Sequence, residues 1–400
     1  MKNLIFKDSQ FEFQTLRVLG SSASGAADIG EVVETAQRIK EGDFKSWCDE
    51  WSKTAKSLEE SAEESYSKGH FISAKKAYLR AANYYRTAEF YLHENPNNPI
   101  IGELYEKSLR CFSYVMKLNK PAIEAVKIPY ENTFLPAHYY KLQNSNGKAP
   151  VLIAMTGYDG TKEEFYGLAM TALEHGMNFL TFEGPGQGEA VRKQKLFFRY
   201  DYEKVVTPVI DYVISRKEVD QAKIILWGES LGGYLAPRAA AFEHRLAACV
   251  ANSGVYDFFG GILRELGNNS REEFFSAARI NPEEFDKNIY SIAKLNSKVR
   301  WGIYHGMYVF GVNSPHEYIL KAEDFYLKDI AEKIKCPTLV IDSDNDGILG
   351  GQSKPLYDVL RCKKEYMFFT SENGAGYHCQ VGAKLIGWER ILSWIEDIIK

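Results

Sequence analysis

One short motif constrains the fold more than any other feature of the sequence. The pentapeptide GESLG at 228–232 directly follows the apolar run 223–227 and precedes a helix-forming stretch. This order of strand, G-x-S-x-G and helix is that of a nucleophile elbow, a strained turn that exposes a serine at the edge of a sheet. Side chains two positions before or after the serine would collide with neighbouring backbone, which explains the glycines. A helix N-terminus beside the serine also favours negative charge. We therefore predict that Ser230 is a catalytic nucleophile.

The residues after 121 have the pattern of a sheet that contains this turn. After residue 121, "AVKIPYENTFLPAHYYKL" alternates around Glu131-Asn132 and predicts a β-hairpin. Short apolar runs then alternate with helical stretches, which is typical of a mainly parallel, doubly wound sheet with helices on both faces. The fold class is therefore α/β. The predicted strands are 151–155, 178–182, 223–227, 247–251, 338–341 and 366–369.

The 400 residues are too many for one ordinary domain. We expect an N-terminal helical domain at 1–121, an α/β core at 122–257 and 336–400, and a helical insertion at 258–335. An insertion of this size between two core strands is a candidate lid. One stretch of the N-terminal region resembles a tetratricopeptide unit, but a single unit cannot form a solenoid, so an ordinary helical domain is expected.

Composition excludes several classes of protein. The net charge is −4, so nothing favours a nucleic-acid or anionic-membrane partner. No window approaches 18 uninterrupted apolar residues, and no signal peptide is expected. The six cysteines are scattered without CxxC pairs, which is typical of a reduced, cytoplasmic protein. Aromatic residues make up 14% of the chain, which indicates large buried clusters or an aromatic-lined pocket.

A nucleophilic serine needs a base and an acid, which follow such an elbow in the order serine, acid, histidine. His378 lies in a glycine-rich loop between the last predicted strand and the final helix, where this fold presents its base. Three aspartates follow strand 338–341. Related proteins with such an elbow place the acid about five residues beyond the strand, before a small apolar pair, and this resemblance implies Asp346, with Asp344 as second candidate. The aspartates lack the glutamate that closes a calcium-binding loop, so we predict no calcium site.

Backbone donors for an oxyanion are expected at two places. One is the N–H of Leu231, directly after the serine, and the other is the N–H of Tyr158 in the small-residue loop after strand 151–155. The run "EGPGQGE" at 183–189 lacks the spacing of a nucleotide-binding loop, so we interpret it as a tight turn beside the active site. No HExxH motif or Cys/His cluster is present, and we predict no metal or organic cofactor.

The motifs together resemble one branch of the α/β-hydrolases. "EGPGQGEA" at 183–190, "WGESLGG" at 227–233, "TGYDGTKEE" at 156–164 and the terminal "GYHC" are similar to 2,6-dihydroxypseudooxynicotine hydrolase and the polyketide chain-shortening hydrolases. The resemblance covers about 120–400 and, through the N-terminal helices, the architecture. It implies an α/β-hydrolase fold, the triad Ser230, Asp346 and His378, and hydrolysis of a carbon–carbon bond beside a ketone. It also suggests a homodimer.

Three hypotheses for function follow. The first is retro-Claisen hydrolysis of a 1,3-diketone, with an aromatic or polyketide small molecule as substrate. The second is a carboxylesterase, thioesterase or peptidase with the same triad. The third is a partner-binding protein that keeps only the hydrolase shell. Aromatic residues are densest in the candidate lid and just before it, so we predict that Trp301, Tyr304 and Tyr256 contact a flat substrate.

Overall fold

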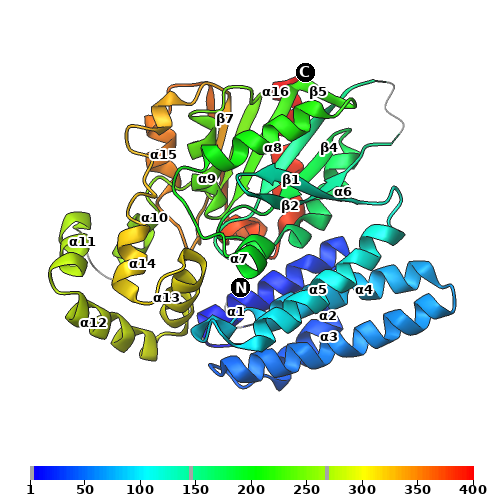
Figure 1. Cartoon of the computed structure of the whole chain (residues 1–400), viewed down its shortest axis with the longest axis horizontal. Helices are drawn as coiled ribbons and strands as arrows, with labels where there is room; N and C mark the ends of the chain where they lie inside the picture. Colours follow the sequence, from blue (N-terminus) through cyan, green and yellow to red (C-terminus); the bar gives the residue numbers. More distant parts are fainter. Residues whose placement is uncertain (1–3, 144–146, 266–269) are drawn as a thin grey trace. The chain divides into compact units, whose positions relative to one another are not determined.

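A computed structural model describes residues 4–143, 147–265 and 270–400 (Figure 1). The chain divides into two compact units. One comprises residues 1–123 and 287–308, and the other comprises 124–286 and 309–400. The inserted segment for which we predict a lid therefore contributes residues to both units.

The first unit is built from helices. Aspartate and asparagine caps fix where they begin: the side chains of Asp8 and Asp43 each accept hydrogen bonds from two N–H groups of the first turn, and that of Asn98 accepts one. The fully buried rings of Trp47 and Trp51 lie four residues apart on one face and form its aromatic core. Its helices are α1 (Ser9–Gly20), α2 (Ile29–Arg38), α3 (Phe44–Ser67), α4 (Phe71–Glu89) and α5 (Pro99–Leu118).

Residues 287–308 complete this unit with most of α12 (Pro282–Leu295) and α13 (Ser297–Phe310). The Ser297 hydroxyl donates to Asp8 at 2.6 Å, and Arg300 pairs with Glu94 at 2.5 Å. These polar contacts tie helix α13 to segments 289 and 206 positions earlier in the chain.

The second unit is built on an eight-stranded sheet in the order β1-β2-β4-β3-β5-β6-β7-β8. The hairpin β1–β2 is antiparallel, and β3 to β8 run parallel. Every residue of β4 and β6 is buried, as expected for strands covered on both faces. The predicted mainly parallel sheet is confirmed, as is the N-terminal helical region. The strands are β1 (Glu124–Tyr130), β2 (Thr133–Tyr140), β3 (Ala149–Met155), β4 (Asn178–Phe182), β5 (Val219–Glu229), β6 (Ala248–Asn252), β7 (Thr338–Ser343) and β8 (Lys364–Phe369).

Helices flank this sheet (Figure 1). Helices α8 and α9 pack on each other and on β5, whereas α6 packs on β4 and on α16. The loops that leave β3, β4, β5, β7 and β8 all lie at the carboxyl edge of the parallel strands, where sites of such folds form. The helices of this unit are α6 (Tyr166–Glu174), α7 (Gly188–Gln194), α8 (Glu203–Ser215), α9 (Gly232–Ala240), α10 (Phe258–Glu265), α11 (Arg271–Ile280), α14 (Pro315–Lys321), α15 (Ser353–Val359) and α16 (Lys384–Ile399).

Across the ranges that the structure describes, no helix combines the length and the apolar character that crossing a bilayer requires.

Candidate active site

Ser230 occupies the turn between β5 and α9 with a backbone φ of 63°, a left-handed conformation that is uncommon for a residue with a side chain. A Cβ at Gly228 would lie 1.9 Å from the Gly232 carbonyl oxygen, and one at Gly233 would lie 2.0 Å from the Ser253 carbonyl oxygen. Both positions therefore require glycine. The Ser230 N–H donates to the Asn252 carbonyl at 2.9 Å, which holds the strained turn against β6.

The structure brings Ser230, His378 and Asp346 together. The Ser230 Oγ lies 2.8 Å from His378 Nε2, and His378 Nδ1 lies 2.7 Å from Asp346 Oδ2. A carboxylate can only accept, so Nδ1 donates its proton, and Nε2 of the neutral ring accepts from the serine hydroxyl. The three side chains form one hydrogen-bonded chain from three separate loops at the carboxyl edge of the sheet.

Asp346 is fixed by four donors. The Ser253 hydroxyl donates to Oδ2 at 2.6 Å, and the N–H groups of Ile348 and Leu349 each donate to Oδ1 at 2.9 Å, in addition to His378. The second candidate points elsewhere: the Asp344 carboxylate accepts from the N–H and hydroxyl of Ser371. Of the two, Asp346 is the one that contacts the histidine.

Asp346 and His378 each stabilise the charged form of the other. Burial opposes ionisation of Asp346, but the charge of His378 and the surrounding hydrogen bonds hold the pKa of Asp346 well below its ordinary value. Burial likewise disfavours a charged imidazole, but the Asp346 carboxylate outweighs it and raises the pKa of His378 well above the ordinary value. A histidine that is stabilised as a cation is a stronger base toward the serine hydroxyl.

The two predicted oxyanion donors lie on adjoining loops. Leu231 is the N-cap of α9, so its N–H stands at the positive end of that helix. A Cβ on Gly157 would lie 2.5 Å from the Leu231 nitrogen and 2.8 Å from the Ser230 Cβ, which shows that the loop before Tyr158 passes directly over the nucleophile. The Tyr158 hydroxyl is hydrogen-bonded to the Tyr318 hydroxyl at 2.8 Å.

A cluster of rings surrounds the Tyr158 side chain. The Tyr158 ring centroid lies 5.6 Å from that of Phe258 and 6.4 Å from that of Phe198. Phe310 and Phe325 continue the cluster, each within 5.3 Å of a neighbouring ring. No local pattern singles out Phe198, Phe310 or Phe325, because only the folded chain brings these separate segments together.

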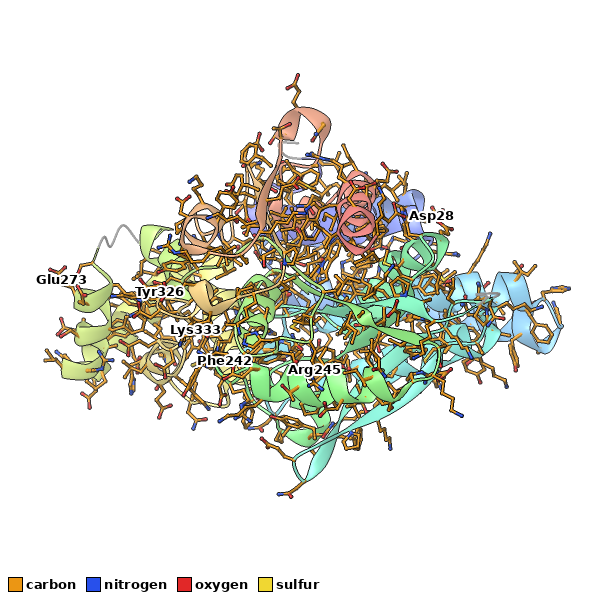
Figure 2. The ribbon with its side chains drawn as sticks, turned by 90° about the horizontal axis from the view of Figure 1, so that it is seen from above. Asp28, Phe242, Arg245, Glu273, Tyr326 and Lys333 are labelled. Carbon is orange, nitrogen blue, oxygen red and sulfur yellow. The ribbon has the colours of Figure 1, made fainter. Side chains whose placement is uncertain are left out.

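The three predicted substrate contacts fall in different units. Trp301 stacks on Phe90 at 4.8 Å and donates its indole N–H to the Phe90 carbonyl at 3.3 Å, within the first unit. Tyr304, on the same helix, packs near Tyr290. Tyr256 lies in the second unit and meets the Tyr326 ring edge-on at 5.1 Å; Figure 2 labels Tyr326 among the side chains of that unit.

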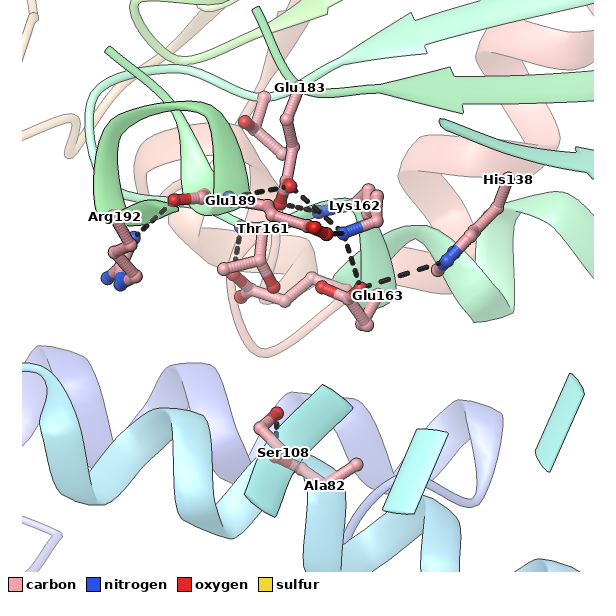
Figure 3. Close-up of polar contacts among 12 residues, drawn as sticks. Ala82, Ser108, His138, Thr161, Lys162, Glu163, Glu183, Glu189 and Arg192 are labelled. Atoms are coloured by element: carbon pink, nitrogen blue, oxygen red, sulfur yellow. Dashed lines mark hydrogen bonds and ion pairs between the residues drawn. The ribbon is translucent and has the colours of Figure 1, made fainter. Parts of the chain in front are cut away.

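The turn 183–189 contains a buried ionic cluster (Figure 3). The fully buried Glu183 carboxylate accepts the Lys162 backbone N–H at 3.0 Å and the Lys162 ammonium at 2.9 Å. Lys162 also pairs with Glu163 at 2.9 Å and with Glu189 at 3.5 Å. Burial alone would lower the pKa of Lys162, but these carboxylates outweigh it and raise the pKa above the ordinary value.

The same charges act on a neighbouring histidine. Burial, reinforced by the Lys162 charge, lowers the pKa of His138 well below its ordinary value and favours the neutral ring. Within the described ranges, no three His, Cys, Asp or Glu side chains are grouped in a way that could hold a metal ion.

Comparisons with known proteins agree with this fold. A family model of the alpha/beta hydrolase fold matches residues 150–374, and a model described as esterase FrsA-like matches residues 12–261. The 20-hydroxy-prefusarin hydrolase FUS2 of Gibberella moniliformis is 32% identical, over 98% of this chain and 97% of the relative. Hydrolase LUC6 of a Fusarium species is 33% identical, over 98% of this chain and 97% of its own.

A solved structure extends the likeness to the fold. The crystal structure of 2,6-dihydroxy-pseudo-oxynicotine hydrolase has a TM-score of 0.74 and 22% sequence identity, and the match covers 95% of both chains. The shared fold therefore includes the N-terminal helices as well as the sheet.

Proposed function

The chain belongs to the α/β-hydrolase family, and we propose that it is a serine hydrolase that cleaves a carbon–carbon bond beside a ketone through an acyl-enzyme. Family membership makes it an enzyme with a small-molecule substrate and removes the hypothesis of a partner-binding shell. The resemblance to the branch of 2,6-dihydroxypseudooxynicotine hydrolase, drawn from the motifs, is confirmed by these comparisons. The observation that carries the proposal is the hydrogen-bonded chain from Ser230 through His378 to Asp346.

In the first half of the reaction, His378 Nε2 takes the proton of the Ser230 hydroxyl while Oγ attacks one carbonyl carbon of a 1,3-diketone. The tetrahedral intermediate collapses by breaking the bond to the central carbon. The electron pair of that bond leaves as an enolate of the second ketone, and the His378 cation returns its proton to the enolate carbon. Ser230 then carries the acyl group, and a ketone is released.

In the second half, water adds to the acyl group with His378 as base, and Ser230 is restored as a carboxylic acid leaves. Asp346 holds the imidazole in position and stabilises its cation, since three further donors fix the carboxylate. The N–H groups of Leu231 and Tyr158 would hold the oxyanion in both halves, each contributing about 3 kcal/mol. No step of this scheme needs a metal or an organic cofactor.

Ester hydrolysis is the second candidate. The observation that favours it is the match to an esterase FrsA-like model over residues 12–261. The triad attacks the carbonyl of an ester or thioester in the same way as that of a diketone. Only the leaving group differs: it is an alkoxide or thiolate instead of an enolate. Turnover of a p-nitrophenyl ester compared with that of a β-diketone separates the two.

The insertion at 258–335 remains our proposed lid, with Trp301, Tyr304 and Tyr256 as proposed contacts to a flat substrate. We propose a reduced, cytoplasmic setting from the scattered cysteines, and a homodimer from the family resemblance alone. The rings around Tyr158 support an aromatic or polyketide substrate, because they lie beside the proposed oxyanion loop.

The test uses a simple aryl 1,3-diketone as probe and Ser230→Ala as variant. The matched control is Ser215→Ala, since Ser215 is an exposed serine of the same unit that bonds only locally to the Tyr212 carbonyl. We expect the wild type and the control to release one carboxylic acid and one ketone per diketone, and Ser230→Ala to release neither. Full hydrolysis by Ser230→Ala would remove the proposal.

A further inference from the structure

Gln187 lies next to the site, in the turn that follows β4, and its side chain is almost completely buried with 1% exposure. It directly precedes helix α7, but its side chain forms no cap there. Instead it reaches across to the loop that leaves β3, which carries the proposed oxyanion donor Tyr158. Nothing in the catalytic scheme above uses this amide.

The amide is held at both ends. Its Nε2 donates to the Thr156 carbonyl at 2.6 Å and to the Gly157 carbonyl at 3.2 Å. Its Oε1 accepts from the Gly184 N–H and from the Tyr202 hydroxyl, each at 3.0 Å. Because two donor groups face Oε1 and two carbonyl acceptors face Nε2, the NH₂ end of the amide must point toward the Thr156–Gly157 loop.

One of these contacts acts on the proposed oxyanion donor. The carbonyl of Gly157 and the N–H of Tyr158 belong to the same planar peptide unit, and in a trans peptide they point in opposite directions. A hydrogen bond that holds the carbonyl toward Gln187 therefore aims the N–H away from it. The Gly157 Cα sits against Ser230 and Leu231, so a small rotation of this peptide would displace the donor relative to the nucleophile.

The turn that carries Gln187 is held in place by Glu183 and by close packing at its glycines. Glu183 accepts the Glu189 N–H at 2.8 Å as well as both Lys162 donors, which ties the turn to the residues after the oxyanion loop (Figure 3). A Cβ at Gly188 would lie 1.8 Å from the Glu183 carboxylate, and one at Gly184 would lie 2.3 Å from the Tyr202 hydroxyl. The two loops are thus joined at two points, by Gln187 and by the Lys162–Glu183 pair.

We propose that Gln187 is a positioning residue that orients the Gly157–Tyr158 peptide, so that the Tyr158 N–H serves as oxyanion donor. This inference rests on the proposed serine-hydrolase function. Gln187 touches neither the serine nor the substrate in this scheme; it acts through the peptide that it holds.

The test variant is Gln187→Glu, which keeps the acceptor for Gly184 and Tyr202 but, when ionised, cannot donate to the two carbonyls. The probe is a fluorophosphonate, whose reaction with Ser230 builds charge on a phosphonyl oxygen in the oxyanion site and does not depend on the natural substrate. We expect the maximal inactivation rate to fall about 10- to 100-fold while the half-saturating concentration changes less than about threefold.

The pH profile of the inactivation rate distinguishes loss of the hydrogen bonds that orient the peptide from a general structural effect of the substitution. A protonated carboxyl can donate in place of the amide, whereas an ionised one cannot, so the ratio of variant to wild-type rate should fall as the pH rises. The matched control is Gln352→Glu. Gln352 is another buried glutamine of this unit, which accepts the Asp257 N–H at 3.0 Å, and its substitution should leave the inactivation rate within about twofold.

The outcomes are distinct. A wild type that the fluorophosphonate does not label at Ser230 would overturn the proposed function itself. A wild type that reacts, beside a folded Gln187→Glu variant that reacts equally fast at every pH, would overturn only the role of Gln187. If Gln187→Glu does not fold, Tyr202→Phe removes one hydrogen bond to the amide; a two- to fivefold lower maximal rate supports the proposal, and an unchanged rate contradicts it.

Discussion

At the scale of single residues, Ser230 is placed by its neighbours. The backbone φ of 63° is strained for serine, and close backbone approaches at Gly228 and Gly233 leave no space for a side chain. The strain is held by the hydrogen bond from the Ser230 N–H to Asn252 and by the packing of α9 on β5 and β6. Such strain is found where a side chain must be presented in one fixed geometry.

Gly228→Ala should therefore displace the serine. The new methyl group would need to move the Gly232 carbonyl, which lies 1.9 Å from its position, and we expect Ser230 labelling by a fluorophosphonate to slow at least 10-fold. Gly102→Ala is the control, because Gly102 sits in helix α5 with nothing near its Cβ position. That substitution should raise the free energy of unfolding by about 0.5–1 kcal/mol and leave labelling unchanged. Equal labelling of both variants would contradict the account of the turn.

The acid and the base make a second prediction at this scale. Asp346→Asn removes the charge that raises the pKa of His378, so burial then dominates and that pKa falls. His378 must be neutral to act as base, so the rise of kcat/KM with pH should move to lower pH in the variant, while the maximal rate drops about 10³- to 10⁴-fold. A pH–rate profile measures both effects. Asp344→Asn, which changes the neighbouring exposed carboxylate, should keep the wild-type profile; a profile that shifts there instead would assign the acid to Asp344.

The pKa shifts of Asp346 and His378 also make the free energy of unfolding depend on pH, and the two residues act in opposite directions. The pKa of Asp346 is lower in the folded state, so its contribution is present above the unfolded pKa and is lost as the pH falls through the folded one. The pKa of His378 is higher in the folded state, so its contribution is present below about pH 6.5 and is lost as the pH rises through the folded value.

At the scale of elements, the loops after β3 and β4 are cross-linked by buried charges. Lys162 faces the buried Glu163 and Glu183 and the partly exposed Glu189. Such a cluster is favourable only while every charge has a partner, because the cost of burying an unpaired charge is large.

Lys162→Met should consequently leave three carboxylates without their shared cation. We expect the free energy of unfolding to fall by about 3–5 kcal/mol, measured by urea denaturation. Lys56→Met is the control: Lys56 is an exposed lysine that faces Glu60 at 3.8 Å, and its loss should give no measurable change. Equal midpoints for the two variants would show that the cluster does not hold these loops.

Most of the strands and the contiguous motifs can be predicted from local sequence. The strands are short apolar runs bounded by turn residues, and the elbow, the terminal GYHC and the glycine-rich turn are contiguous motifs, so each can be located without knowing the fold. The contacts of Gln187 with Thr156 and Gly157 join residues about 30 positions apart, and those of Ser253 with Asp346 span 93 positions. Local patterns carry no signal for such pairs, although the glycines around Gln187 mark the turn as crowded.

At the scale of the whole molecule, the long insertion is the part that sequence patterns described least well. Its sequence predicts helices, but a helical pattern does not say which unit a helix joins. Trp301 packs on Phe90 and His305 in the first unit, and the side chains of Tyr256 and Tyr326 meet in the second.

Trp301→Ala tests whether that helix also serves the substrate. Loss of the stacking on Phe90 should lower the free energy of unfolding by about 1–3 kcal/mol, less than for a core residue because Trp301 is only partly buried. If the insertion is a lid, KM for the diketone should rise severalfold in the protein that remains folded. Phe90→Leu is the matched variant, since it weakens the same packing without changing Trp301; an equal rise in KM there would assign the effect to packing alone.

The central claim is that Ser230 becomes acylated when a carbon–carbon bond breaks. The most direct measurement is mass spectrometry of the protein quenched during turnover of an aryl 1,3-diketone, with the released products identified in parallel. We predict an acyl group on the peptide that contains Ser230, with one ketone and one carboxylic acid formed in equal amounts. Rapid hydrolysis of p-nitrophenyl esters, with no adduct and no cleavage from the diketone, would contradict the account and leave an ester hydrolase.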